Sequence, residues 1–162
     1  MLGDNMKNNK GFTLIELLAV IVVLAIVMVL AATTVLPYMS SARENAFKVE
    51  ATNVVKAAES AKDLYTLGQV TIPTNSCVSG TTMCLTVDEL ITLGIYDGDP
   101  NTFDGKVVIT NYNGNNPTYT LNLKKNTEFT IIDGTGKDYS KYTGSLTGTW
   151  PADNSASTCS CS

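Results

Sequence analysis

The chain has 162 residues, no histidine, and 15 acidic against 11 basic side chains, for a formal net charge of −4. A single hydrophobic core organises about 100–200 residues, so this length suits one domain with an appendage and excludes a large multidomain enzyme. The acidic balance gives no global positive field for nucleic acid, and the lack of histidine removes the commonest general base and zinc ligand. We therefore expect no enzyme activity, no cofactor and no nucleic-acid partner.

The first predicted element is a long apolar segment. Residues 17–36, LLAVIVVLAIVMVLAATTVL, carry no charged side chain. As a helix they would span about 30 Å, the thickness of a bilayer's hydrocarbon core. Lys7 and Lys10 precede them, which predicts a cytoplasmic N-terminus and an exported remainder. The alternative is a signal peptide cut near Ala31 and Ala32, although the apolar region of such a peptide normally spans only about 7–15 residues.

One carboxylate directly precedes this segment. It belongs to Glu16, in the stretch GFTLIEL at residues 11–17. A charge near hydrocarbon is costly unless it snorkels to the interface or finds a partner. A lone membrane helix permits the first solution, and a helix bundle requires the second.

The helical pattern continues past Pro37 with different chemistry. Apolar side chains recur at helical spacing and form a single stripe, made of Phe47, Ala51, Val54, Ala58, Ala61 and Tyr65. Gly68 predicts the end of the helix. We expect one helix of about 55 residues, apolar all round over residues 12–37 and amphipathic over 38–67. A later part of the chain is expected to pack on the apolar stripe.

The elements expected to pack on the stripe follow in residues 68–133. Residues 68–105 are interpreted as a loop from helix to sheet that contains a short helix at 87–93. Thr86 is its expected N-cap, Glu89 completes a capping box, and Gly94 ends the helix.

An antiparallel meander is predicted over residues 106–133. Its strands are expected at 106–112, 118–124 and 128–133. In the middle strand Tyr119, Leu121 and Leu123 alternate with Thr120, Asn122 and Lys124. One face of the strand should therefore be buried and the other exposed to solvent. The tail, residues 134–162, ends in a CxC pattern; Tyr139, Tyr142, Leu146 and Trp150 predict partial packing, with another short strand near 145–150.

The basic leader, Gly11, the stretch FTLIEL, the apolar helix, its amphipathic continuation and the meander together resemble a type IV pilin. The resemblance is specific over residues 11–36 and rests on the order of elements afterwards. It implies the α+β type IV pilin fold, a long N-terminal helix packed on a meander of about three to four strands. The abundant Lys and Asn favour a Gram-positive source.

The resemblance also implies processing of a leader, residues 1–11. A prepilin peptidase would cut between Gly11 and Phe12 and methylate the new amine on Phe12; Met6 offers a second start with the shorter leader MKNNKG. The amine would lie four residues from Glu16, or face Glu16 of an adjacent copy, so the pair would fix the register of assembly. Many type IVa pilins carry a mid-membrane proline, which this chain lacks before Pro37.

The function implied is a structural subunit that polymerises through its N-terminal helix into a surface pilus for adhesion, aggregation or motility. The implied partners are identical subunits, the prepilin peptidase, the assembly platform with its ATPases, and the membrane before assembly. The alternative is a pseudopilin of a type II secretion or DNA-uptake machine. A third class is a single-span anchored binding module that keeps its N-terminus and never polymerises.

Four cysteines lie beyond the apolar run, at Cys77, Cys84, Cys159 and Cys161. In an exported segment disulfides are expected. A bond between Cys159 and Cys161 would close a strained ring, so we favour two links from the tail to the 69–85 loop. A Cys77–Cys84 loop with free tail thiols and a four-thiolate zinc site stay open as alternatives.

Two weaker patterns complete the sequence. Asp97, Asp99, Asn101 and Asp104 resemble an oxygen-rich calcium loop, but Pro100 and the missing later glutamate favour a solvated turn. Four lysines near Tyr139 and Tyr142 could contact DNA, but in an acidic chain they favour ordinary solvated surface; they are Lys124, Lys125, Lys137 and Lys141.

Overall fold

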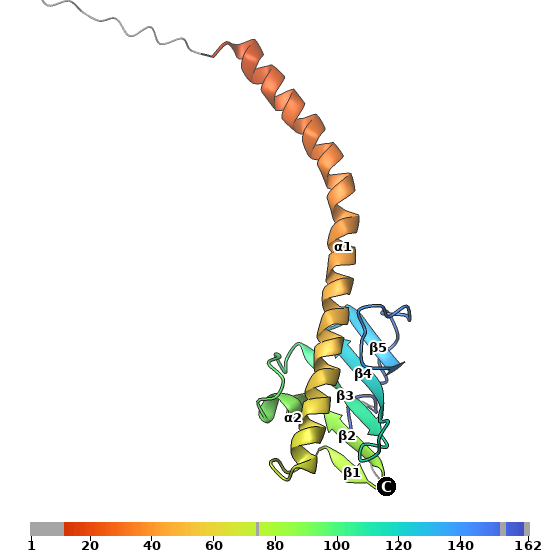
Figure 1. Cartoon of the computed structure of the whole chain (residues 1–162). Helices are drawn as coiled ribbons and strands as arrows, with labels where there is room; N and C mark the ends of the chain where they lie inside the picture. The colour runs from red at the N-terminus through yellow and green to blue at the C-terminus, as the bar shows by residue number, and fades with distance from the viewer. Residues whose placement is uncertain (1–11, 74, 153–154, 161–162) are drawn as a thin grey trace, which may run out of the picture. The chain divides into compact units, whose positions relative to one another are not determined.

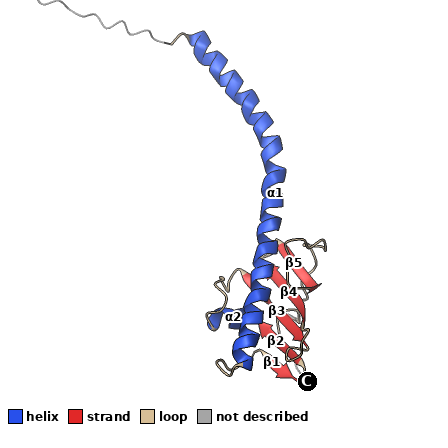
Figure 2. Ribbon diagram, in the orientation of Figure 1, coloured by secondary structure: helices blue, strands red, loops and turns tan. Residues whose placement is uncertain are grey.

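The computed structural model describes residues 12–73, 75–152 and 155–160 (Figures 1 and 2). The chain divides into two compact units, Met1–Ser41 and Ala42–Ser162. The α+β class predicted from the sequence is confirmed: a long N-terminal helix precedes an antiparallel sheet that packs against its later part.

The helix α1 runs from Leu14 to Thr66 and contains Pro37. It ends as the sequence predicts, because Gly68 adopts a left-handed φ of +69° that a side chain would disfavour. The Gly68 N–H donates to the Tyr65 carbonyl and the Gln69 N–H to the Leu64 carbonyl, both at 2.9 Å. These bonds satisfy carbonyls that the end of a helix leaves without partners.

The second unit holds a five-stranded antiparallel sheet in the order β1-β2-β3-β4-β5 (Figure 2). Its strands follow chain order, and the short helix α2 (Val87–Thr92) lies between the second and the third. The strands are β1 (Cys77–Ser79), β2 (Thr82–Thr86), β3 (Phe103–Thr110), β4 (Thr118–Lys125) and β5 (Phe129–Thr135).

The core lies between the sheet and the later part of α1, which runs along one sheet face (Figure 1). The predicted stripe is confirmed, since five of its residues are fully buried and Tyr65 is partly buried; the five are Phe47, Ala51, Val54, Ala58 and Ala61. The sheet contributes Val107, Ile109, Tyr119, Leu121, Leu123 and Ile131. Three ion pairs border this core: Arg43–Glu128, Glu50–Lys125 and Glu59–Lys137.

The interpretation of residues 68–105 as a loop was wrong in two places. The segment contains the hairpin of β1 and β2, turned at Gly80 with a φ of +57°, and β3 begins at Phe103 rather than at 106. The sheet therefore has five strands rather than three to four. The Ser, Thr and Gly content of this segment indicates a loop, but Met83 and Leu85 are fully buried opposite Ile109 and Val107 of β3. Pairing with a distant strand overrides the local composition.

The prediction that Asn122 lies on the solvent-exposed face of β4 was wrong, because its side chain is buried. Its amide oxygen accepts a hydrogen bond from the Asp133 N–H at the irregularity in the β4–β5 pairing. The tail lies against β5, where the Leu146 carbonyl accepts a bond of 2.8 Å from the Thr130 N–H. The predicted strand near 145–150 is a single bridge, between Thr130 and Thr147.

The start of α2 departs from the predicted capping box. Glu89 is buried and its carboxylate accepts the Thr86 hydroxyl, rather than the Thr86 N–H that a capping box would use. That N–H donates instead to the Ser76 hydroxyl at 3.1 Å. The Asn75 N–H and the Ser76 hydroxyl also donate to Glu89, so one buried acid joins the chain before β1 to the start of α2.

Candidate functional site

In the first unit, the described part of α1 has an exposed apolar surface. Every described side chain from Phe12 to Val35 is exposed, and among the described residues α1 is the one helix long and apolar enough to cross a membrane. An exposed apolar surface of this length is unfavourable in water. The segment therefore requires lipid or other protein around it.

Thr13 and Glu16 form a reciprocal capping box at the start of this helix. The Thr13 N–H and hydroxyl each donate to Glu16 Oε2 at 2.8 Å, and the Glu16 N–H approaches Thr13 Oγ1 at 3.4 Å. The box satisfies donors that the first turn of a helix leaves unpaired. Our sequence interpretation missed the role of Thr13, although the Thr-x-x-Glu pattern before an apolar run is its ordinary signature.

Thr13 donates hydrogen bonds to one of the two oxygens of the Glu16 carboxylate. Both bonds from Thr13 end on Oε2, and within residues 12–73, 75–152 and 155–160 no cation pairs with Glu16. Phe12 is 89% exposed, while Gly11 lies outside the described residues. The acid is thus exposed beside apolar neighbours, with Oε1 open to an incoming donor.

The tail is joined covalently to the sheet. Cys84 of β2 is bonded to Cys159, across 75 residues of sequence and with Cα atoms 5.7 Å apart. This pairing contradicts a Cys77–Cys84 loop, and the described cysteines include no free thiol for a four-thiolate zinc site. Cys77 is disulfide-bonded as well, whereas Cys161 lies outside the described residues.

We expect the second link to join Cys77 to Cys161. The expectation rests on the Cys84–Cys159 bond, which uses two of the four cysteines, and on the disulfide-bonded state of Cys77. Peptide mapping of the unreduced protein should find a crosslinked pair of peptides that contains these two residues. Free thiol at either residue, or a mixed pairing with Cys84, would refute the assignment.

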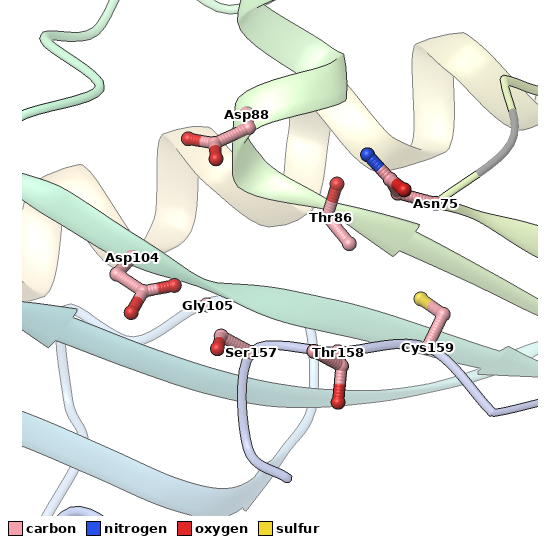
Figure 3. Close-up of a pocket in the computed structure, with 8 residues that line it drawn as sticks. All are labelled: Asn75, Thr86, Asp88, Asp104, Gly105, Ser157, Thr158 and Cys159. Carbon is pink, nitrogen blue, oxygen red and sulfur yellow. The ribbon is translucent and has the colours of Figure 1, made fainter. Parts of the chain in front are cut away.

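A polar pocket of about 490 Å³ lies where the tail crosses β3 (Figure 3). Side chains of α2 and β3 and residues of the tail border it (Figure 3); its lining is Asn75, Thr86, Asp88, Asp104, Gly105, Ser157, Thr158 and Cys159. Nearby, Lys106 Nζ donates to the Ser155 and Thr158 carbonyls at 2.7 and 2.8 Å. The tail, which is bonded to β2 through Cys159, therefore forms one part of the pocket wall.

The four calcium-loop candidates do not converge on one point. Asp99 Oδ1 accepts from the Asn101 N–H at 2.9 Å, and this bond together with those from Thr102 and the Asn101 amide lowers the pKa of Asp99. Asp104 lies 3.3 Å from Lys124, and Asp97 lines a different recess. The described residues contain no cluster of three His, Cys, Asp or Glu side chains suited to a metal.

Three of the four candidate DNA-contacting lysines are paired with acids. Lys124 bonds to Asp104 and lies over Trp150, Lys125 bonds to Glu50, and Lys137 bonds to Glu59 and lies over the Tyr119 ring. Such pairing neutralises the positive field that a phosphate backbone would require.

Residues 6–32 of the chain match the family described as the prokaryotic N-terminal methylation motif. The matched segment begins at Met6 and extends into the apolar helix that follows Glu16. No curated protein and no solved structure matches the chain.

Proposed function

We propose that this chain, which carries the type IV prepilin signature before an α+β head of type IV pilin layout, is the structural subunit of a surface pilus. The signature implies processing by a prepilin peptidase and polymerisation into a filament. It belongs to structural proteins rather than to enzymes. Together with the apolar helix it fits membrane anchoring before assembly.

The observation that carries the proposal is the unpacked apolar surface of α1 with one carboxylate at its start. A simple anchor needs the apolar surface, but it gains from the acid only the cap with Thr13, and the charge weakens insertion. Helices gathered in a filament bury the same surface and can supply a cation. Repetition of a head-to-tail contact that does not close produces an open helical polymer.

The cation is the amine that cleavage between Gly11 and Phe12 creates. In the filament it binds Glu16, and Oε1 is the oxygen left available by Thr13. Attraction between two charges is much stronger among apolar helices than in water. A subunit that slipped along its neighbour would leave both charges unpaired, so the pair selects one register.

Mass analysis of the N-terminus tests this proposal. Surface filaments sheared from cells should contain a mature chain that begins with methylated Phe12, because cleavage and methylation precede assembly. A membrane-bound chain with its leader intact, and no filaments, would support an anchored binding module instead.

The rival function is a pseudopilin of a secretion or DNA-uptake machine, which the same signature permits. Electron microscopy separates the two: long fibres with this chain as their bulk component support the pilus. Short filaments with DNA binding or calcium-dependent stability of the head would support the rival. The ion-paired lysines favour the pilus over DNA uptake.

A further inference from the structure

The first residue of α1 is set by Thr13. The helix begins at Leu14, and the Glu16 and Leu17 N–H groups donate to the Thr13 carbonyl at 3.1 and 3.2 Å. The Thr13 side chain and N–H also bond to Glu16, so Thr13 makes the hydrogen bonds of an N-cap. Phe12 consequently lies outside the helix, and its side chain is exposed.

The position of this cap bears on leader removal. The expected scissile bond joins Gly11 to Phe12, directly before Thr13. Proteases act on chain segments whose backbone is not tied into helical hydrogen bonds. A helix that started a few residues earlier would draw the scissile peptide into its first turn.

Residues able to start the helix earlier are present in the sequence. Gly11 is an acceptable N-cap, and Asn9 is among the strongest because its side-chain oxygen can accept from the first turn. If the Thr13 hydroxyl were lost, either residue could take over as the N-cap, and the helix would then start earlier in the chain. The Thr13 cap is therefore what favours the later start.

We propose that Thr13 is a positioning residue for processing: its cap begins α1 at Leu14 and so keeps Phe12, which supplies the nitrogen of the expected scissile bond, outside the helix. The inference rests on the proposed function, since it assumes that a prepilin peptidase cuts this chain. It assigns a role in processing to the cap that Thr13 makes with Glu16 Oε2, while Glu16 Oε1 remains available for assembly.

The test is the rate of leader loss from the full chain in membranes that contain a prepilin peptidase. Thr13→Val removes the hydroxyl with little change in shape, and we expect leader loss to slow by about two- to fivefold, the scale of a lost N-cap. Thr13→Ser restores the acceptor and should restore the rate. Thr34→Val is the matched control, because that hydroxyl donates to the Ala31 carbonyl at 3.0 Å within the apolar part of α1, away from the cut.

Rates are measured on membrane-inserted chain, separated by alkaline extraction, so that an insertion defect does not enter the comparison. Thr13→Val cleaved at the wild-type rate would overturn the role of Thr13, as would slow cleavage of Thr13→Ser. Failure of the wild-type chain to be cleaved would instead overturn the proposed function. Equal slowing in Thr34→Val would show a general effect of hydroxyl loss and also overturn the inference.

Discussion

Replacing Glu16 with alanine should reduce filament yield roughly 100-fold or more, while membrane insertion and leader cleavage persist. The mature amine of Phe12 would then be buried among apolar helices without its acid, and an unpaired buried charge costs about 3–5 kcal/mol. Each 1.4 kcal/mol is about a tenfold change in an association constant. Cleavage should persist because the backbone N–H at position 16 still donates to the Thr13 carbonyl and still approaches the Thr13 hydroxyl, although the two bonds from Thr13 to the carboxylate are lost.

Quantification of sheared filaments against total processed subunit measures this effect. Glu44→Ala is the matched control, because it removes a carboxylate from the same helix outside the apolar segment. It should assemble as the wild type does. Wild-type filament yield with Glu16→Ala would eliminate the charge pair as the basis of register.

Removal of the Cys84–Cys159 link should give the largest loss of stability in the head. The bond spans 75 residues, and a crosslink that closes a loop of this size restricts the unfolded chain strongly. Cys159→Ser should lower the free energy of unfolding by about 2–5 kcal/mol. The tail would keep the expected link from Cys77 to Cys161 and weaker contacts, such as the bonds from Lys106 to the Ser155 and Thr158 carbonyls.

Thermal unfolding of the full chain in detergent, followed by circular dichroism, measures the change. Ser160→Ala is the control, since it alters an exposed tail residue beside the crosslink. Addition of a reductant should lower the wild-type midpoint at least as far as the substitution does. An unchanged midpoint for Cys159→Ser would contradict the stabilising role of this link and mean that the link at Cys77 and the noncovalent contacts are sufficient to hold the tail.

Most of the helix and the later strands could be predicted from local pattern. The stripe that begins at Phe47 has the period of a helix, and Gly68 ends it through a φ that glycine adopts without strain. The alternation of Tyr119, Leu121 and Leu123 correctly marks the buried side of β4. These features depend on neighbours within a few residues, which a single sequence displays.

The two capping boxes show where local pattern becomes insufficient. Thr13 and Glu16 follow the pattern in both sequence and structure. Thr86 and Glu89 follow it in sequence, but the chain before β1 brings Ser76 and the Asn75 N–H to the same carboxylate. A partner 13 or 14 residues away is invisible to a four-residue motif, so the same motif becomes a cap in one place and a tertiary junction in the other.

The sequence by itself determined the apolar helix, the processing motif and the isolated acid at Glu16, because each is a property of consecutive residues and the solvent that suits them. Only the tertiary structure decided that the Ser- and Thr-rich segment before α2 forms a hairpin, that Asn122 is buried, and that Cys84 bonds to Cys159. Those outcomes depend on which distant segments meet. Burial and crosslinking are set by contacts across the folded chain, and no local composition specifies them.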